Sequence, residues 1–514
     1  MPYHRLSSAM PLALLACLAI VTPASAQKSK DTLRIAFLEA TQSTDPYTDS
    51  KPENYFLGSG LWDTLIVYDE VERHYAPLLA KSFKRVDDKT FEFELRDDVK
   101  WVDGESFDAD DVVYTFDWAT APDTKLRNKP DWDGLQAEKI DAHKVRIKSS
   151  HPMPNMLDVI AVRLFIFPEH IHRQLADKEV FGTKPVGTGM WRATQVDRNA
   201  GDIFVKNPNY KHGGKAKPAS NIGHVEVIPV PDEGTQMAHF LRGDLHLIRN
   251  TPLEQAEAMA QNPAYAMTLA QSLSYLYLSF DAAGRSGLKP VQDIRVRKAM
   301  MMAVKPEDVY RIRTGNHKLP RGMVESLCWN VQEGCDYSTK PPAYDPEGAK
   351  KLLAEAGYKD GFAIQLTTFN STKDMAEVVV GQLRKVGIRA SVDAQTFVAY
   401  RKKQADGKLN ALANAWSAGS SADVASTINF FFAPGPRDYF HDPELQNFAK
   451  LALTTIDPDK RKEAMRGLMD RASEQAYIFP VAPIPLVFLH IADLKINELR
   501  YDSYGIQPSD LNWK

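Results

Sequence analysis

The feature that most constrains the fold is the alternation of strand-like and helix-like segments along the chain. Apolar residues recur with the period of two that is typical of half-buried strands in segments 32–37, 90–101, 144–150 and 224–230. They recur with helical spacing in segments 293–304, 345–358, 374–388 and 457–476. A chain that mixes both patterns throughout is predicted to form α/β lobes, not an all-helical bundle.

Local residues mark the ends of two of these helices. In segment 345–358, Asp345 can cap the N-terminus, Pro346 fits the first turn, and Gly357 can end the helix. Gly387 ends segment 374–388 in the same way. Both helices are therefore predicted with their bounds.

Segment 100–116 (KWVDGESFDADDVVYTF) combines a strand end, a turn and a helix. An Asp-Gly turn at 103–104 follows the strand, and either Ser106 or Asp108 can cap the helix that comes next. The apolar side of this helix is formed by Val112, Val113 and Phe116. We expect a local unit of strand, turn and capped helix.

The length of 514 residues predicts roughly two to four domains at about 150 residues each. The 63 basic and 66 acidic side chains nearly cancel, which gives no bulk electrostatic reason to expect nucleic acid binding. No fixed-period repeat is evident, and residues 211–220 (KHGGKAKPAS) are expected to form a surface loop.

Residues 1–26 have the pattern of a secretory signal peptide. His4 and Arg5 precede an apolar run at 12–21, and Ala-Ser-Ala at 24–26 supplies a cleavage site of small residues. The signal predicts export from the cytoplasm.

We expect the mature chain to begin at Gln27 and to be a soluble periplasmic protein. An alternative signal at 14–17 (LLAC) would leave Cys17 as a lipidated anchor, but it is unusually short and apolar residues continue beyond it. No later stretch has the roughly 18 uninterrupted apolar residues of a membrane helix, because segment 477–492 contains three prolines and a histidine.

Removal of the signal would leave two cysteines, Cys328 and Cys335, separated by six residues in a loop that contains Gly and Asn. In an oxidising compartment this pair is expected to form a disulfide, which would restrain the unfolded chain by about 2–3 kcal/mol. Two free thiols or a metal pair are the alternatives, but no further cysteine lies nearby to complete a metal site.

The spacings that hydrolases and nucleotide-binding enzymes require are absent. The sequence has no Gly-x-Ser-x-Gly elbow, no His-Glu-x-x-His pair and no Gly-x-x-x-x-Gly-Lys-Ser/Thr loop. The glycine pairs in 58–62 (GSGLW) and 187–191 (GTGMW) lack the third glycine of a dinucleotide loop, and both are interpreted as turns.

Other polar pairs are weak candidates for chemistry. His170 and His172 could suggest metal ligands, and the acidic pairs 97–98 and 110–111 could suggest paired carboxylates. Adjacent side chains diverge on a helix or strand, so the acidic pairs are better explained as solvated surface.

Aromatic residues are the richer signal. Core packing explains most of them and a ligand pocket explains some, because pockets combine apolar walls with a few polar groups. The aromatics in segments broken by Gly, Ser and Asn are Tyr47, Tyr55, Phe56, Trp62, Trp191, Trp416 and 430–432. Trp416 is the strongest single candidate for a ligand contact.

Several stretches form a set that is informative when it is taken in order along the chain: 43–47 (STDPY), 61–70, 76–119, 185–196, and then NPNYKHGGKAK, FLRGDLHLI, DIRVRKAMMMAV and YDPEGAKKLLAEAGY. In this order they resemble the peptide-type extracellular solute-binding proteins of ABC transporters, the family with dipeptide-, oligopeptide- and nickel-binding members. Residues 43–47 and 61–70 resemble the opening of the family, and 76–119 resembles its most recognisable block. Segment 185–196 resembles the family's Gly-Thr-Gly-Pro-Tyr turn, with Met and Trp replacing Pro and Tyr.

The resemblance implies an α/β fold like that of periplasmic binding proteins, with three lobes and a ligand cleft between lobes I and III. By this analogy the lobe boundaries are 27–62, 186–275 and 486–514 for lobe I, 63–185 for lobe II, and 276–485 for lobe III. In this family lobe II supports the architecture and does not touch the ligand.

The family's mechanism implies that two strands between the lobes bend and the cleft closes, and that a permease recognises the closed form. Segments 276–282 and 485–491 are the candidate crossovers. A ligand populates the closed state only through the difference between its affinities for the two forms, so both sides of the cleft must contact it.

The resemblance also implies where the ligand-binding residues lie. The candidates are Trp416, Ser417, Gly419 and Asp423, together with Tyr47 and Thr188. In dipeptide and oligopeptide binders an Asp shortly after the Trp accepts the α-ammonium group of the ligand. Here Gly419 holds that position, and Asp423 could serve only if the loop takes a different path.

The usual arginine for a ligand carboxylate is also missing near 365–375, where Lys373 is a partial substitute. Both ionic anchors of a dipeptide are therefore in doubt. A modified peptide, an opine-like conjugate, a glycoside or a metal chelate remain open as ligands.

We therefore expect a receptor, not an enzyme, that captures a small peptide or peptide-like solute and delivers it to ABC permease subunits in the inner membrane. A secreted hydrolase and a periplasmic chaperone or scaffold are the alternative functions. No cofactor, catalytic metal or nucleic acid is expected, and the receptor is expected to be a monomer.

Overall fold

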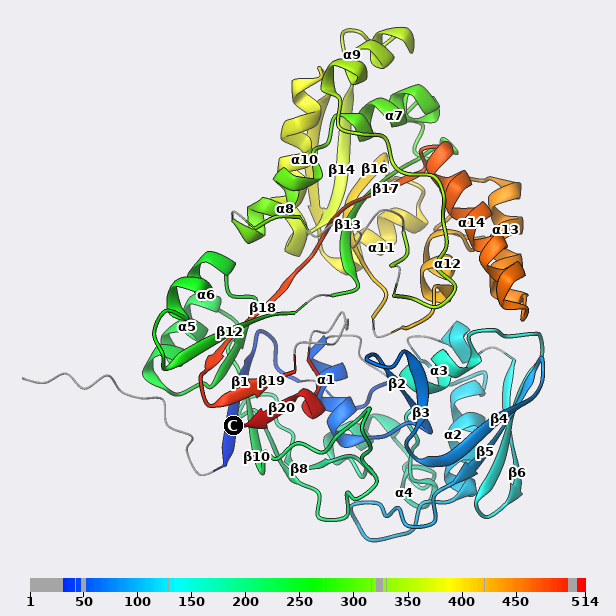
Figure 1. Cartoon of the computed structure of the whole chain (residues 1–514), viewed down its shortest axis with the longest axis vertical. Coiled ribbons are helices and arrows are strands. Elements are labelled where there is room, and N and C mark those ends of the chain that lie inside the picture. The colour runs from blue at the N-terminus through cyan, green and yellow to red at the C-terminus, as the bar shows by residue number, and fades with distance from the viewer. Residues whose placement is uncertain are drawn as a thin grey trace, which may run out of the picture.

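The computed structural model describes residues 31–497 and 506–514, apart from gaps at 42, 48–51, 127–128, 133, 271, 316, 320–326, 330 and 420. The predicted signal peptide, Gln27 and Cys17 lie outside the described residues. Figure 1 shows two bodies joined by two extended connections. We call residues 274–483 the upper body, and the described residues before 271 and after 485 the lower body.

Seven strands of the lower body form one mixed sheet. Across the sheet they are β12 (Tyr265–Ala270), β18 (Leu486–Ile491), β11 (Leu247–Arg249), β1 (Thr32–Phe37), β10 (His224–Pro229), β9 (Asp202–Lys206) and β8 (Trp191–Gln195). Strand β1 runs parallel to β10 and β11, and the other neighbours pair antiparallel. The elements that accompany this sheet are α1 (Pro52–Leu61), α5 (Glu233–Arg242), α6 (Leu253–Met259), β19 (Leu494–Ile496), η5 (Pro508–Asp510) and β20 (Leu511–Trp513).

A second sheet of the lower body is wholly antiparallel. Its strands are β4 (Ala80–Asp87), β5 (Thr90–Leu95), β7 (Lys144–Ser149) and β6 (Leu135–Asp141). The elements around it are the hairpin β2 (Ile66–Asp69) and β3 (His74–Pro77), with α2 (Ala109–Thr120), η1 (Lys129–Trp132), α3 (Met156–Arg163), α4 (Glu169–His172) and η2 (Lys178–Thr183).

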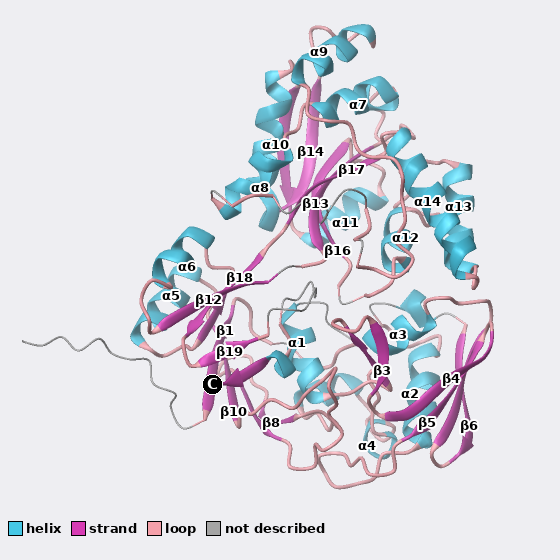
Figure 2. Ribbon diagram, in the orientation of Figure 1, coloured by secondary structure: helices cyan, strands magenta, loops and turns pink. Residues whose placement is uncertain are grey.

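The upper body is built on a five-stranded sheet with helices on both faces (Figure 2). Its strands are β15 (Arg389–Gln395), β14 (Ala363–Phe369), β16 (Ala411–Ser417), β13 (Ser274–Phe280) and β17 (Ile478–Pro483). One face packs on η3 (Pro290–Gln292), α7 (Ile294–Met302), α8 (Pro306–Thr314), α9 (Pro346–Glu355) and α10 (Lys373–Lys385), which follows η4 (Asn370–Thr372). The other face packs on α11 (Phe397–Ala405), α12 (Ala425–Phe431), α13 (Pro443–Thr454) and α14 (Pro458–Glu474).

The predicted mixture of strands and helices is confirmed, and so are several element ends. Phe91, Phe93 and Leu95 are buried on one face of β5. The side chain of Asp345 caps α9 by accepting a hydrogen bond from the backbone N–H of Gly348 at 2.9 Å. Gly357 follows α9 with a φ of +87°, in the left-handed region that favours glycine.

In segment 100–116, Asp108 is the residue that caps α2, and its carboxylate accepts from the backbone N–H of Asp110 at 2.8 Å. The interpretation of both acidic pairs as solvated surface is wrong for Asp111, which is 4% exposed. Its carboxylate accepts from the backbone N–H of Asp108, the indole of Trp101 and the backbone N–H of Glu169. Burial raises the pKa of Asp111 to about 6.

The prediction of a turn at 58–62 is also wrong, since Gly58 and Gly60 lie in α1. A Cβ on Gly60 would come within 2.9 Å of the Trp191 ring, and a Cβ on Gly189 within 2.3 Å of the Gly60 carbonyl oxygen. The two glycine pairs therefore allow the end of α1 to pack directly on the 187–189 backbone.

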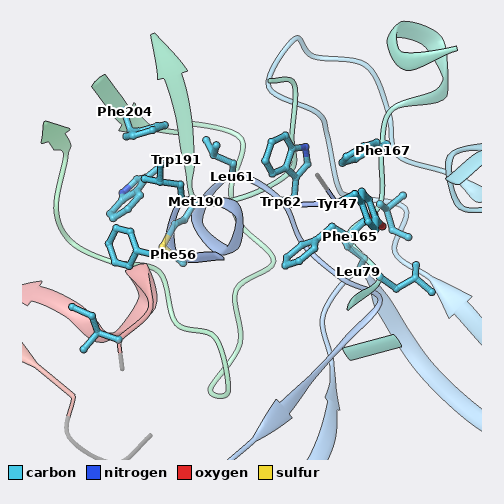
Figure 3. Close-up of a cluster of buried hydrophobic side chains, with 14 of the residues drawn as sticks. Tyr47, Phe56, Leu61, Trp62, Leu79, Phe165, Phe167, Met190, Trp191 and Phe204 are labelled. Atoms are coloured by element: carbon cyan, nitrogen blue, oxygen red, sulfur yellow. The ribbon is translucent and has the colours of Figure 1, made fainter. Parts of the chain in front are cut away.

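One hydrophobic core runs through both sheets of the lower body. Leu33 of the seven-stranded sheet and Phe93 of the four-stranded sheet belong to the same cluster of buried residues. Figure 3 shows its centre, where Leu61 lies between an aromatic group around Trp191 and another around Trp62. The predicted boundaries between lobes I and II stay a prediction, but the shared core indicates that the lower body moves as one unit.

A buried polar centre lies beside this core. The Asp63 carboxylate accepts hydrogen bonds from the Thr188 hydroxyl at 3.0 Å, His212 Nε2 at 2.7 Å and Lys217 Nζ at 2.5 Å. Segment 211–220 was predicted to be a surface loop, but Lys217 is 5% exposed because its ammonium group pairs with Asp63. Burial acts to raise the pKa of Asp63, but the positive charges of Lys217 and His212 outweigh it and hold that pKa well below its usual range.

We predict that Asp63→Asn lowers the free energy of unfolding by about 3–5 kcal/mol, because it leaves a buried ammonium group without a countercharge. Urea unfolding at neutral pH measures the change. Asp97→Asn, which removes an exposed ion pair with Lys81, is the control and should change stability little. Equal effects of the two variants would contradict the prediction. Because the pKa of Asp63 is lowered, its contribution is present at neutral pH and lost only in strong acid.

Candidate functional site

The chain passes between the two bodies twice, and the two connections are hydrogen-bonded to each other. One connection joins β12 to β13, and the other, residues 484–485, joins β17 to β18. The Ser272 hydroxyl donates to the Ile484 carbonyl oxygen at 2.9 Å, and the Ile484 N–H donates to Ser274 O at 2.9 Å. Most of the predicted crossover 276–282 lies in β13, which ends at Phe280, so the crossing occurs a few residues earlier.

The carboxyl ends of three strands meet at the edge of the upper sheet that adjoins these connections. Ser274 at the start of β13 pairs with Ser417 at the end of β16, which places the end of β16 beside the crossing. Strands β14 and β15 run parallel to β16, so they end at the same edge. In open α/β sheets ligands bind outside the carboxyl ends of the strands, which makes this edge the candidate ligand site.

Trp416 lies at this edge on β16. Its ring stacks on Phe430 with centroids 4.0 Å apart and an interplanar angle of 23°, and it meets Phe431 edge-on at 5.5 Å. Its indole Nε1 is buried and has no hydrogen-bond acceptor among the described residues. Trp416 therefore offers a flat apolar surface and one unused donor.

Arg437 lies beside this aromatic pair. The guanidinium carbon is 5.4 Å from the centroid of the Phe430 ring, an arrangement that stabilises the cation through the ring quadrupole. Burial, together with the positive charge of the nearby Arg401, lowers the pKa of Arg437. Within the described part of the chain no carboxylate pairs with the Arg437 side chain. We call Trp416, Phe430, Arg401 and Arg437 the arginine–aromatic cluster.

The candidates that follow Trp416 lie between the end of β16 and the start of α12, and we call the described residues there, 417–419 and 421–424, the 417–424 loop. Ser417 is exposed, and its hydroxyl oxygen accepts a hydrogen bond from the Gly419 N–H at 3.1 Å. Gly419 has a φ of +68°, in the left-handed region where glycine is preferred. This backbone conformation favours glycine over most other residues at position 419.

Asp423 is 1% exposed and is bound within the upper body. Its two carboxylate oxygens accept from the two terminal nitrogens of Arg461, each at 2.6 Å, and one also accepts from the Ala425 N–H. A ligand ammonium group would have to displace these internal bonds. The loop does not follow the path that would free Asp423 for a ligand.

The two remaining candidates lie in the lower body. Tyr47 is 5% exposed among the rings of Trp118, Trp132 and Phe167, and its hydroxyl donates to Phe165 O at 2.5 Å. The Thr188 hydroxyl donates to Asp63. The structure uses these polar groups internally and does not bring them to the arginine–aromatic cluster.

The sequence analysis did not identify two residues, Arg437 and Asp158, that the structure places near Trp416 and the 417–424 loop. Arg437 follows the aromatic run 430–432 in a loop rich in Pro and Gly, a composition that could have suggested a binding loop. Asp158 on α3 contacts the loop 417–424 from the lower body, and no local pattern distinguishes it from other acidic residues on a short helix.

The two histidines considered as metal ligands have separate roles. His172 Nδ1 lies 2.6 Å from the Tyr114 hydroxyl inside an aromatic cage, and burial lowers the pKa of His172 to about 3. His170 Nε2 pairs with Asp103 at 2.8 Å. Among the residues that the structure describes, no three His, Cys, Asp or Glu side chains are grouped so as to hold a metal ion. In the same residues, no helix is both long and apolar enough to span a bilayer.

The sequence model of bacterial extracellular solute-binding proteins, family 5 (middle), matches residues 74–438. The chain belongs to this family. It is 26% identical over 530 residues to the nickel-binding periplasmic protein of Escherichia coli K12, with 94% of each chain covered. It is also 26% identical over 471 residues to the glutathione-binding protein GsiB of the same strain, with 88% of each covered.

A solved structure shares the fold. NikA from Brucella suis, in complex with Fe(III)-EDTA, superimposes with a TM-score of 0.82 at 23% identity, and the match covers 94% of this chain and 100% of that one. The predictions of family, of a periplasmic-binding-protein fold and of a receptor for an ABC importer are confirmed. Because its relatives are solute-binding proteins, the chain is not an enzyme, and it works outside the cytoplasm as they do.

Proposed function

We propose that this receptor captures a small peptide-like solute that carries a carboxylate, and delivers it from the periplasm to an ABC permease in the inner membrane. The observation that carries the proposal is the arginine–aromatic cluster at the carboxyl edge of the upper sheet. A half-buried guanidinium group without a carboxylate partner in the described chain is positioned beside a stacked aromatic surface.

The chemistry of the cluster fits an anionic, partly flat solute. A guanidinium group binds a carboxylate through two parallel hydrogen bonds, and such charge-assisted bonds strengthen where water is excluded. The stacked rings of Trp416 and Phe430 supply an apolar wall, and the unused Trp416 N–H can donate to a carbonyl oxygen of the solute.

The first turn of α11 supports the same conclusion. Its N-cap Thr396 lies at the carboxyl end of β15, where the helix N-terminus favours negative charge. Phe397 and Val398 in that turn are 63% and 79% exposed, which leaves apolar surface beside the site. Phe397 lies 5.8 Å from Phe369 at the end of β14.

The cluster also bears on which solutes are favoured. With Gly419 at the usual acceptor position and Asp423 bound to Arg461, the family's acceptor for a free α-ammonium group is missing. A modified peptide, an opine-like conjugate or a carboxylate chelate therefore fits better than a free dipeptide or a neutral glycoside. By their names, related proteins bind glutathione and nickel, and glutathione is a peptide derivative with two carboxylates.

Delivery would follow from closure of the two bodies. A solute held by the upper sheet edge stabilises the closed form by the contacts that it gains from the lower body. The paired connections beside Ser272 and Ile484 are the segments that would bend. The permease would then recognise the closed form of the receptor. The receptor would act as a monomer after removal of residues 1–26, with Gln27 as its first residue; anchoring through Cys17 is the alternative.

We expect Arg437→Gln to weaken solute binding by about tenfold or more, because a charge-assisted hydrogen bond contributes roughly 1.5–3 kcal/mol. Native mass spectrometry of freshly purified protein identifies the retained solute, and calorimetry measures its affinity. Arg242→Gln, an exposed arginine of the lower body, is the matched control. A retained solute without a carboxylate, or an unchanged affinity in Arg437→Gln, would contradict the proposal.

Trp416→Ala should lower the affinity for the same solute more than it lowers the stability of the empty protein, because the half-buried ring packs mainly on Phe430 at the sheet edge. Thermal unfolding without solute and calorimetry with it separate the two effects. A large fall in the unfolding temperature with unchanged affinity would assign Trp416 to the core.

We also propose that Cys328 and Cys335 are disulfide-bonded in the periplasm. Their sulfur atoms lie 1.98 Å apart, and their Cα atoms 5.7 Å apart. The loop that they close is hydrogen-bonded to residues 421–424, through Glu333 N–H to Ala422 O at 2.6 Å and Val424 N–H to Glu333 O at 3.1 Å.

Reduction of this disulfide should therefore speed hydrogen exchange in both 328–335 and 421–424 while the protein stays folded. Exchange measured by mass spectrometry, with and without reductant, tests this expectation. Alkylation of two free thiols in protein taken from the periplasm, or unchanged exchange in 421–424, would refute it.

A further inference from the structure

Two carboxylates of the lower body bond to the upper body: Glu257 on α6 pairs with His317 at 2.6 Å, and Asp158 on α3 contacts the loop that follows Trp416. Asp158 on α3 accepts a hydrogen bond from the Ser421 hydroxyl at 2.6 Å through one oxygen, and from the Ala422 N–H at 2.8 Å through the other. Asp158 is 5% exposed. In Figure 1, α3 lies at the top of the lower body, below the chain that leads into α12.

The loop that Asp158 contacts is the one that carries the ligand-site residues Ser417 and Gly419. Further bonds hold this loop to the rest of the upper body: Gln332 Nε2 donates to Ser421 O at 3.3 Å, and Arg461 pairs with Asp423. Because the loop is fixed at these points, a contact at 421–422 also orients the backbone that leads back to Trp416.

The surroundings of Asp158 disfavour its charge. Burial raises the pKa of Asp158 to about 7, and the negative charge of Asp423 adds to this effect, while the bonds from Ser421 and Ala422 oppose it. The other titratable or charged groups nearby are Glu333 and Arg461 of the upper body, Tyr68, Glu70, Arg73 and Tyr75 of the β2–β3 hairpin, Arg85 of β4, and Arg163 at the end of α3.

Arg461 is committed to Asp423, and both side chains belong to the upper body. The ion pair therefore persists when the bodies separate. Asp158 leaves the contact on opening and regains water, so its pKa returns toward the usual range of an aspartate.

We propose that Asp158 is a positioning residue that holds the 417–424 loop in its ligand-binding geometry, and that it takes up a proton as the two bodies close. The inference rests on the proposed function in one respect, that closure accompanies solute capture. It assigns to the lower body a direct role in setting the ligand loop, which the architecture of the family alone does not give.

The sign of the pH dependence follows from the two states of Asp158. The carboxyl binds a proton more tightly in the closed receptor than in water, so acidification favours closure. The equilibrium between the open and closed forms should shift toward the closed form as the pH falls from about 8 to about 5. The ratio of closed to open receptor should rise by at most about tenfold for each unit of pH. A protonated carboxyl keeps one oxygen to accept from Ala422 and can donate with the other.

Spin labels on exposed Lys89 of the lower body and Lys402 of the upper body report the closed fraction by their distance distribution. The measurement is made on the full mature chain without solute, from about pH 8 to about pH 5. We expect the closed fraction of the unmodified protein to rise as the pH falls. A closed fraction that is independent of pH would overturn the proposal.

Two variants separate the effect of the negative charge of Asp158 from the effect of its hydrogen bonds to Ser421 and Ala422. Asp158→Asn keeps an oxygen for Ala422 and gains a donor for Ser421, so it should weaken the pH dependence, leaving only that of other groups such as the Glu257–His317 pair, and close at pH 8 at least as well as the unmodified protein. Asp158→Ala removes both bonds and should be more open at every pH. Asp117→Asn, an exposed carboxylate of α2, is the control and should keep the original pH profile.

Retention of the original pH profile by Asp158→Asn, or equal opening in Asp158→Asn and Asp158→Ala, would overturn the proposal. Far-UV circular dichroism and thermal unfolding establish that each variant is folded. Because the readout needs no solute, it is separate from the identity of the ligand. Failure of the proposed carboxylate solute would appear as lost binding with pH-dependent closure intact.

Discussion

The passage of the chain between two bodies with separate cores is the constraint on which the rest of the structure depends. Two connections cross side by side and are held together by the bonds between Ser272, Ser274 and Ile484. The crossing fixes one end of the interface, so the remaining freedom is largely that of opening and closing. A group placed across the interface therefore responds to closure more than to any other motion.

Helix α3 moves with the rest of the lower body because it packs in the shared core. Residues of both lower sheets pack in one buried cluster, so α3 is carried with the seven-stranded sheet as the bodies move. The 417–424 loop is likewise tied to the upper body through Arg461 and Gln332. Asp158 and Ser421 thus connect two rigid units, and their separation measures the state of the receptor.

Local chemistry made much of the fold predictable. The alternation in 90–95 and the capping of α9 by Asp345 depend on residues within a few positions of one another. The features that sequence analysis missed depend on distant partners. Lys217 is buried in a glycine-rich loop because it meets Asp63, 154 residues earlier, and Asp158 meets Ser421 across 263 residues. No local pattern carries such information.

The arrangement of charges explains why the contact between Asp158 and Ser421 can form and break as the two bodies close and open. Two carboxylates, Asp158 and Asp423, come close in the closed form, but one guanidinium group compensates only the second of them. A buried charge without its own partner costs free energy, so the bridge alone is a weak source of stability at neutral pH. Closure then depends on a further favourable contribution, from a proton at Asp158 or from a solute at the arginine–aromatic cluster. Because the two contributions both favour the closed form, each should strengthen the effect of the other.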